Sequence, residues 1–251
     1  MRDIQDYTDK YIDEPFEDTM VTIRKRIVIS QCNQYVHRNI LEIGCGTNPF
    51  FLDFHDYDQM VIVEPGAAFA ERAEKLAAKE KKPIQIIPGF LEEAVEAVKA
   101  SGIAFDFVIL SSVLHELDEP QKMLRAIGSL CNQRTVVHIN VPNATSLHRL
   151  IAIEAGMIED VHAKSTQMKT MQRRRVYDME SLKQEIMDAD FTTLDSGTYF
   201  IKPFTHAQMQ RCLDEGIIDE KVLMGLEKLT KYIPAFGAGI YVNAKCNSKE
   251  L

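Results

Sequence analysis

Short apolar runs alternate with longer segments of helical periodicity along the first 142 residues. This alternation is typical of a parallel sheet whose strands are connected by helices. The predicted strands lie near 39–43, 60–64, 84–88, 105–111 and 134–141, and the helices between them near 66–81, 90–100 and 119–131. The last helix has start signals in Asp118 as N-cap, Pro120 in the first turn and Gln121 three residues after the cap.

The pattern changes after Pro142. In residues 145–158 one helical face carries Leu147, Leu150, Ile151 and Ile158, whereas residues 159–176 are polar and basic. The later predicted elements are a helix at 178–190, a strand near 193–201, helices near 205–214 and 219–233, and a strand at 238–245. In the helix that precedes Pro234, a buried stripe is predicted from Val222, Leu226, Leu229 and Ile233. The chain therefore reads as an α/β fold.

The most specific motif is the run from Ile40 to Asn48. An apolar strand passes into Glu42 and then into two glycines, Gly44 and Gly46. About twenty residues later a second apolar strand ends in Glu64, at the spacing seen in nucleotide-binding sheets. A glycine loop after one strand and a carboxylate at the end of the next favour the binding of a nucleoside.

A dinucleotide-binding enzyme, such as an NAD-dependent dehydrogenase, is the runner-up for this motif. Its fingerprint needs a third glycine, and Pro49 stands in that place. Proline has no N–H to offer to a pyrophosphate. Glu42 would also face the phosphates with a negative charge, so that a cationic amino-acid group suits the loop better.

The segment Glu42-Ile-Gly44-Cys-Gly46 resembles motif I of class I S-adenosylmethionine-dependent methyltransferases. Glu64 matches the acidic residue of that family, and Phe105–His115 resembles its fourth strand and following loop. The resemblance covers residues 38–142 well and the C-terminal third more loosely. It implies a Rossmann-like, mostly parallel seven-stranded sheet with helices on both faces and an antiparallel last strand. Asn48 departs from the pattern, since many members have a third glycine there.

The resemblance also implies a domain organisation. Residues 1–251 are expected to form a single methyltransferase domain with a small helical cap. In similar enzymes, material like the N-terminal segment 1–37 and the insert 143–177 forms a lid over the substrate. We therefore predict an N-terminal helical lid and a cap insert.

S-adenosylmethionine is the implied cofactor. In this resemblance Glu64 accepts hydrogen bonds from both ribose hydroxyls, and Tyr11 with Arg24 closes over the cofactor carboxylate. Phe90 either packs on the adenine or belongs to the ordinary core. The predicted cofactor-binding residues are Tyr11, Arg24, Glu42, Gly44, Cys45, Gly46, Asn48, Glu64, Pro65, Gly89, Phe90, Leu91, Ser111, Ser112 and Val113.

His115 is the first candidate for a catalytic base, because it follows the fourth strand on the loop that faces the methyl group in similar enzymes. Histidine titrates in the right range to remove a hydroxyl proton. The alternative is that His115 only packs or hydrogen-bonds to the cofactor. His148 is the second candidate. His115-Glu116 does not begin a zinc motif, because H-E-x-x-H needs a histidine where Glu119 stands, and no metal is predicted.

The acceptor side is predicted to include Asn143, Arg149, Arg173 and Arg175. Arginines can grip a carboxylate or a phosphate. The alternatives are a surface salt bridge for Arg149 and a solvated face for the run of three arginines. In an acidic protein, a basic cluster in a predicted lid favours an anionic acceptor.

Composition narrows the function further. The net charge of −8 disfavours a general nucleic-acid binder, which normally has a basic surface. Five widely spaced cysteines without a C-x-x-C pair indicate neither a disulfide framework nor a zinc site, and favour the reducing cytoplasm. The polar, acidic N-terminal segment resembles neither a signal peptide nor a membrane span.

The sequence thus predicts an S-adenosylmethionine-dependent enzyme that methylates a small molecule in a biosynthetic role. Oxygen is favoured as the acceptor atom, on a sugar, a phosphate-bearing metabolite or a natural-product-type metabolite. The alternatives are a non-catalytic protein that binds the cofactor and a protein or RNA methyltransferase. No oligomeric state is predicted.

Overall fold

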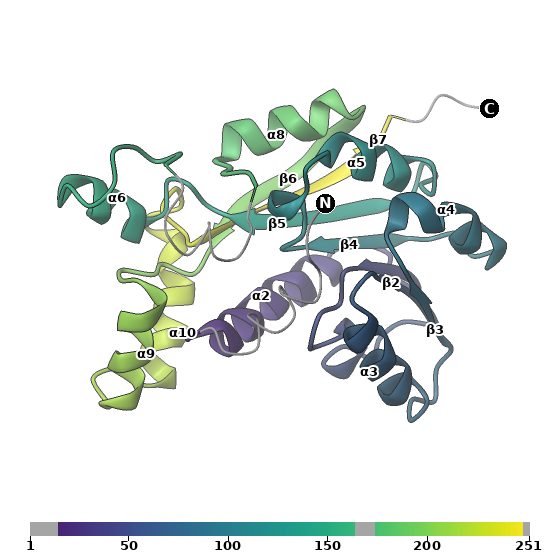
Figure 1. The fold of residues 1–251 in the computed structure, drawn as a ribbon, viewed down its shortest axis with the longest axis horizontal. Coiled ribbons are helices and arrows are strands. Elements are labelled where there is room, and N and C mark those ends of the chain that lie inside the picture. The colour runs from purple at the N-terminus through teal and green to yellow at the C-terminus, as the bar shows by residue number, and fades with distance from the viewer. Residues whose placement is uncertain (1–14, 164–173, 248–251) are drawn as a thin grey trace.

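A seven-stranded mixed sheet forms the centre of the computed structural model, which describes residues 15–163 and 174–247 (Figure 1). The strand order is β3-β2-β1-β4-β5-β7-β6. The strands are β1 (Asn39–Ile43), β2 (Gln59–Glu64), β3 (Ile84–Pro88), β4 (Phe107–Ser111), β5 (Val136–Pro142), β6 (Phe191–Tyr199) and β7 (Gly239–Cys246). β7 runs antiparallel to both β5 and β6, and all other pairs are parallel. The predicted sheet is confirmed.

Helices cover both faces of this sheet. α2 (Glu17–Cys32) and α3 (Ala67–Ala77) lie on one face, and α4 (Leu91–Ala100), α5 (Pro120–Gly128) and α8 (Met179–Asp188) lie on the other (Figure 1). The central strands are apolar on both sides because each face is buried under helices. One core cluster includes Leu41 and Val108, and a second, on the α2 side, includes Ile40 and Phe107.

A smaller helical group lies beside the β7–β6 end of the sheet (Figure 1). It consists of α6 (Leu147–Glu154), α9 (His206–Asp214) and α10 (Glu220–Lys228). A third cluster, with Phe16, Phe200 and Leu223 among its members, joins the start of α2 to α9 and α10. Three short 3-10 helices complete the described chain: η1 (Phe50–Leu52), η2 (Leu114–Glu116) and η3 (Leu229–Lys231).

The predicted start of α5 is wrong in detail. The N-cap is Glu119, and its side chain makes no capping hydrogen bond within the described chain. Asp118 instead pairs with Arg174, with 3.1 Å between Oδ1 and Nε. Pro120 does occupy the first turn, as predicted.

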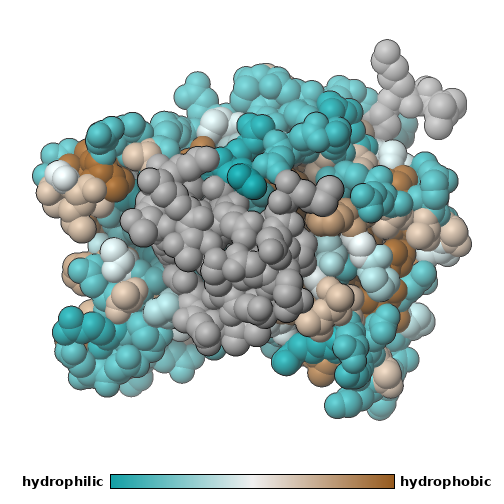
Figure 2. All heavy atoms as spheres, in the orientation of Figure 1, coloured by the Kyte–Doolittle hydropathy of each residue, from teal (hydrophilic) through white to brown (hydrophobic). Residues whose placement is uncertain are grey.

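The predicted buried stripe of α10 is corrected in part. The buried residue of α10 is Leu223, Leu226 of the predicted stripe packs partly buried against the third cluster, and Val222 is 44% exposed. α6 has no buried residue, and Ile151 is 45% exposed. Hydrophobic surface is visible over α6 in Figure 2. Helical spacing identifies an apolar face, but which face meets a partner depends on how neighbouring elements pack.

The predicted lids fall only partly within the described residues. Of segment 1–37, helix α2 packs against β4 and β5 as part of the layer that covers the sheet. Of insert 143–177, residues 164–173 lie outside the described chain. The lid and cap roles, and the single domain, therefore stay predictions.

Candidate active site

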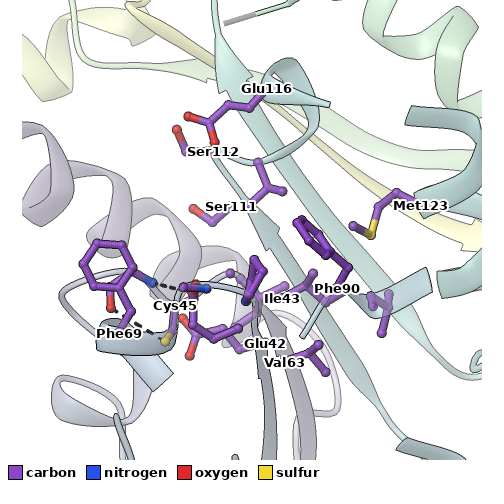
Figure 3. Close-up of a pocket in the computed structure, with 18 of the residues that line it drawn as sticks. Glu42, Ile43, Cys45, Val63, Phe69, Phe90, Ser111, Ser112, Glu116 and Met123 are labelled. Carbon is purple, nitrogen blue, oxygen red and sulfur yellow. Dashed lines mark hydrogen bonds between the residues drawn. The ribbon is translucent and has the colours of Figure 1, made fainter. Parts of the chain in front are cut away.

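A cavity of about 610 Å³ opens where β1, β2 and β4 end (Figure 3). Its described lining comes from α2, from the loops after these three strands and from the start of α4 and α5. This is the position at which open α/β sheets bind ligands, beside the carboxyl ends of parallel strands. The volume is typical of a site for a small ligand.

The glycine loop forms one wall of this cavity. Gly44 and Gly46 have φ values of 77° and 55°, a left-handed backbone that residues with a side chain rarely adopt. A Cβ on Gly44 would lie 2.8 Å from Cγ2 of Val113. Both glycines are therefore required by the backbone, and Gly44 also lets the loop approach the end of β4.

Glu64 is held at the end of β2 by backbone donors. The N–H of Gly46 donates to Oε2 at 3.0 Å, and the N–H of Gly66 donates to Oε1 at 2.7 Å. Burial raises the pKa of this carboxyl, and the two backbone hydrogen bonds act against that shift. Each oxygen retains capacity to accept a further hydrogen bond, so the carboxylate is oriented to receive a pair of hydroxyl groups.

Glu42 lies below the glycine loop and is almost completely buried. Its two oxygens accept from the N–H of Phe50 at 3.2 and 3.0 Å. Burial raises the pKa of Glu42 to about 7, although this hydrogen bond and the charge of Lys25 lower it. A cation placed beside Glu42 would stabilise its charged form. Neighbouring Cys45 is buried as well, and burial raises the pKa of its thiol.

Asn48, which departs from the family pattern, ties the loop to α2. Nζ of Lys25 donates to Oδ1 of Asn48 and to the carbonyl oxygen of Pro49, both at 2.9 Å, and also contacts Asp53. Lys25 is itself largely buried. A glycine at position 48 would remove one hydrogen-bond acceptor of this buried lysine. This explains why an asparagine stands where many family members have a glycine.

A second wall of the cavity follows β3 and the start of α5. Gly89 has a φ of 131° and donates its N–H to the carbonyl oxygen of Glu64 at 3.0 Å. Phe90 lines the cavity together with Met123, and Figure 3 shows these two side chains near each other. Leu91 lines it too, and so does Pro65 on the β2 side. The sequence analysis did not anticipate Met123.

The end of β4 forms the third wall, with Ser111, Ser112 and Val113 on the lining. Ser112 has a φ of 60°, an unfavourable value for a residue with a side chain. Its N–H donates to the carbonyl oxygen of Asn140 at 2.9 Å, which holds this turn to β5. Strained backbone at such a place is common at functional sites.

On the α2 side, Arg24 lines the cavity together with Glu17. Nη2 of Arg24 lies 2.9 Å from Oε1 of Glu17, and both side chains are mostly buried. The structure therefore places Arg24 on the wall of this cavity, and its role in cofactor binding stays a prediction. Tyr11 lies outside the described residues.

His115 and Glu116 occupy different places although they are adjacent in sequence. Among the described residues, the lining of the cavity includes Glu116 but not His115. His115 is only 2% exposed and borders a small void of about 30 Å³ on the other side, with Asn143, Arg149 and Arg175. The catalytic role of His115 stays a prediction, and Glu116 is a lining residue that the sequence analysis did not select.

His148 lies on α6, away from the described lining of the large cavity. Its pKa is lowered to about 2, mainly by burial and further by the charges of Lys202, His206 and Arg149. A neutral imidazole with so low a pKa is a weak proton acceptor. The role of His148 as a base therefore gains no support and stays a prediction.

Asn143 serves the backbone around it. Its side-chain amide donates to the carbonyl oxygens of Ala235 and Gly237, at 3.1 and 2.9 Å, and its Oδ1 accepts from the N–H and the hydroxyl of Thr145. These bonds join the end of β5 to the segment before β7. Its predicted role in acceptor binding stays untested.

Arg149 and Arg175, the two described arginines predicted for the acceptor side, do not line the large cavity. The guanidinium of Arg149 donates to the carbonyl oxygens of Val161 and Ala163, and so anchors the chain after α6. Arg175 is exposed and lies 3.6 Å from Glu185. Arg173 lies outside the described residues.

The described residues contain no group of three His, Cys, Asp or Glu side chains that could hold a metal ion. No helix among them is long and apolar enough to cross a membrane.

The family follows from comparison with known proteins. A family model described as a methyltransferase domain matches residues 19–196, so the chain belongs to this methyltransferase family. The chain matches no curated protein sequence significantly. It is an S-adenosylmethionine-dependent methyltransferase.

Solved structures with this fold include enzymes of different chemistry. One is the 1,6-didemethyltoxoflavin-N1-methyltransferase of Burkholderia thailandensis with bound S-adenosylhomocysteine (14% identity, 98% of this chain and 87% of that chain, TM-score 0.58). Another is a possible histamine N-methyltransferase of Thermotoga maritima (16% identity, 89% and 87%, TM-score 0.55). A third is the [4+2]-cyclase SpnF (15% identity, 90% and 81%, TM-score 0.57). At these identities the likeness shows the fold alone.

The cavity fits S-adenosylmethionine. Glu64 presents two oriented acceptor oxygens, as a ribose diol requires. The left-handed glycines let the backbone come close to a ligand, and Glu42 offers a buried carboxylate to an ammonium group. Phe90 and Met123 provide apolar surface for a base.

Proposed function

We propose that this enzyme transfers a methyl group from S-adenosylmethionine to a small organic molecule that enters beside Ser112 and Glu116. One observation carries the proposal: a single cavity joins the glycine loop and Glu64 to the turn after β4. A cofactor held by the loop would therefore share its space with the acceptor.

The residues of the chain would act mainly by alignment. The cofactor supplies a methyl group on a positively charged sulfur, which is already strongly electrophilic. Gly44, Gly46 and Glu64 would fix the nucleoside and amino-acid parts, and Val113 would close the space beside Gly44. Holding the acceptor in line and excluding water then account for most of the rate gain.

The charge of the lining bears on the acceptor. Among the described residues, eight carboxylate and three cationic residues line the cavity. They are Glu17, Glu42, Glu64, Glu92, Glu93, Glu116, Asp118 and Glu119, with Arg24, Lys25 and Lys122. This excess of negative charge favours a neutral or cationic acceptor over the anionic one expected from the arginines.

The acceptor atom is part of the proposal as well. The sequence analysis favoured oxygen, on a sugar, phosphate-bearing or natural-product-type molecule. One structure of this fold is named as an N1-methyltransferase and another as a possible histamine N-methyltransferase. We therefore propose a hydroxyl or an amine on a small metabolite.

A cytoplasmic location is supported by five free cysteines.

Methyl transfer to a small molecule can be tested directly, which the fold alone does not do, since the [4+2]-cyclase SpnF has a similar fold. Incubation with methyl-labelled S-adenosylmethionine and a small-molecule extract should transfer label to a small product. Label that appears only in protein or RNA would contradict a small-molecule acceptor.

Calorimetry with S-adenosylhomocysteine tests cofactor binding directly. We expect wild type to bind, and Glu64→Ala to bind roughly 100-fold more weakly, because two hydrogen bonds to a charged group are lost. Glu96→Gln is the matched control, since this exposed carboxylate on α4 pairs with Lys99 outside the described lining. Absence of binding by wild type would overturn the proposal.

A further inference from the structure

On the basis of the function proposed above, Glu116 is a candidate contact for the methyl acceptor. Glu116 is 7% exposed, yet it lines the large cavity. Figure 3 shows its carboxylate near the side chain of Ser112, apart from Glu42 and Cys45 at the glycine loop. A nearly buried carboxylate thus faces the part of the cavity that lies beyond the predicted cofactor residues.

The backbone fixes this orientation. The left-handed Ser112 turns the chain after β4, and the N–H of Glu116 donates to the carbonyl oxygen of Val113 at 2.9 Å. The N–H groups of Arg174 and Arg175 both donate to the carbonyl oxygen of His115 at 3.0 Å. The turn Leu114–Glu116 is therefore held from both sides, so Glu116 is directed to the cavity and His115 into the interior.

His115 lies directly behind Glu116. Its Nε2 atom is 3.9 Å from Oε1 of Glu116, and both side chains are buried. At this distance the imidazole of His115 can interact with the carboxylate of Glu116, whereas Glu116 stands between His115 and a ligand in the large cavity. The order of the two side chains, cavity then Glu116 then His115, assigns the contact with the acceptor to the carboxylate.

Glu116 differs from the other lining carboxylates in its position beside Ser112 (Figure 3). Glu64 and Glu42 lie at the loop where the nucleoside and amino-acid parts belong. Glu17 lies beside Arg24, Asp118 and Glu119 pair with Arg174 and Lys122, and Glu92 and Glu93 stand in the first turn of α4. A carboxylate in a low-dielectric wall favours a ligand that brings positive charge or a strong hydrogen-bond donor.

We propose that Glu116 is the residue that binds the acceptor at the transfer position, and that the acceptor is an amine. Glu116 accepts one proton from the ammonium form of the acceptor. The freed nitrogen lone pair forms the bond to the methyl carbon, while the electron pair of the broken carbon–sulfur bond stays on sulfur. The product leaves as the methylated ammonium, so charge and atoms balance.

Sinefungin tests this assignment without knowledge of the acceptor. In this analogue a carbon with an ammonium group replaces the methylated sulfur, so a positive charge occupies the place of the transferred methyl. S-adenosylhomocysteine has no charge there. Calorimetry gives the ratio of the two affinities for each protein at pH 7.5. We expect Glu116→Gln to lower the preference for sinefungin roughly 10- to 100-fold, the effect of losing one hydrogen bond between charged groups.

Two further variants make the result specific. Glu116→Asp keeps the charge at a greater distance and is expected to restore part of the preference. Glu96→Gln removes an exposed carboxylate of α4 and is expected to leave the ratio unchanged. An unchanged ratio in Glu116→Gln, with S-adenosylhomocysteine still bound, would overturn the role of Glu116 but leave the proposed function standing. Failure of wild type to bind either ligand would overturn both.

Discussion

At the scale of single residues, Glu42 makes cofactor binding depend on pH. Its pKa of about 7 in the free protein means that the carboxyl is mostly protonated at pH 6. The ammonium group of a bound amino acid favours the ionised form. Binding should therefore drive a proton off Glu42 at pH 6, whereas at pH 8.5 the carboxyl is already ionised.

We expect binding of S-adenosylhomocysteine at pH 6 to release between about half a proton and one proton per site, and almost none at pH 8.5. Calorimetric titrations in buffers of different ionisation enthalpy measure this number. In Glu42→Gln the release should disappear. Equal release by wild type and this variant would show that another group titrates.

The residues of the glycine loop could be predicted because the physical requirements on them come from neighbouring residues in the sequence. Gly44 and Gly46 are required by backbone angles within one turn, and Glu64 by its spacing from them. Asn48 could not be explained in this way, since its partner Lys25 comes from α2. The choice between His115 and Glu116 depends on the left-handed φ of Ser112, which a sequence does not show.

At the scale of secondary-structure elements, period alone located the helices but not their contacts. α10 buries Leu223, which is not in the predicted stripe, and of that stripe Leu226 packs partly buried against the same cluster, which contains Phe16 from the far N-terminal part of the chain. The strands were easier to predict. Each parallel strand is covered on both faces, so its apolar run does not depend on which side is inward.

A buried polar chain links β7, β5 and β4. The amide of Asn243 donates to Gln31, and its Oδ1 lies 2.8 Å from Nδ1 of His138. Nε2 of His138 lies 3.1 Å from the amide of Asn140, which donates to the hydroxyl of Ser111 on the cavity wall. The amide oxygen of Asn243 accepts a hydrogen bond from Nδ1, and the amide nitrogen of Asn140 donates one to Nε2. This arrangement fits a neutral imidazole with its proton on Nδ1.

His138, in the middle of these hydrogen-bonded side chains, makes the free energy of unfolding depend on pH. Burial lowers the pKa of His138 to about 4, below its ordinary value of 6.5. Between these values the unfolded chain binds a proton that the native state does not, so stability falls as the pH falls from about 6.5 to 4. This histidine should account for a loss of about 2 kcal/mol between pH 7 and pH 5.

Urea unfolding of wild type and His138→Gln at both pH values measures this contribution. The variant should be less stable than wild type at pH 7, because the hydrogen-bonded ring is lost, but its stability should change less between the two pH values. A parallel pH dependence in the two proteins would assign the effect to other groups.

At the scale of the whole molecule, helices from both faces of the sheet contribute residues to the lining of the large cavity. Lys25 of α2 holds the glycine loop on one face, and Met123 of α5 lines the cavity from the other. A ligand that contacts both layers binds the native state and has no comparable site on the unfolded chain. Ligand binding should therefore stabilise the entire fold rather than one loop.

The magnitude follows from the affinity. S-adenosylhomocysteine at 100 times its dissociation constant adds about 2.7 kcal/mol to the free energy of unfolding. For a chain of this size that corresponds to a rise in melting temperature of roughly 5–10 °C. Thermal unfolding followed by circular dichroism, with and without ligand, gives this shift. Lys25→Met should show a smaller shift at the same ligand concentration, since the loop loses its hydrogen bonds to α2 and the cavity loses one lining cation. A full shift in that variant would mean that the glycine loop keeps its shape without α2.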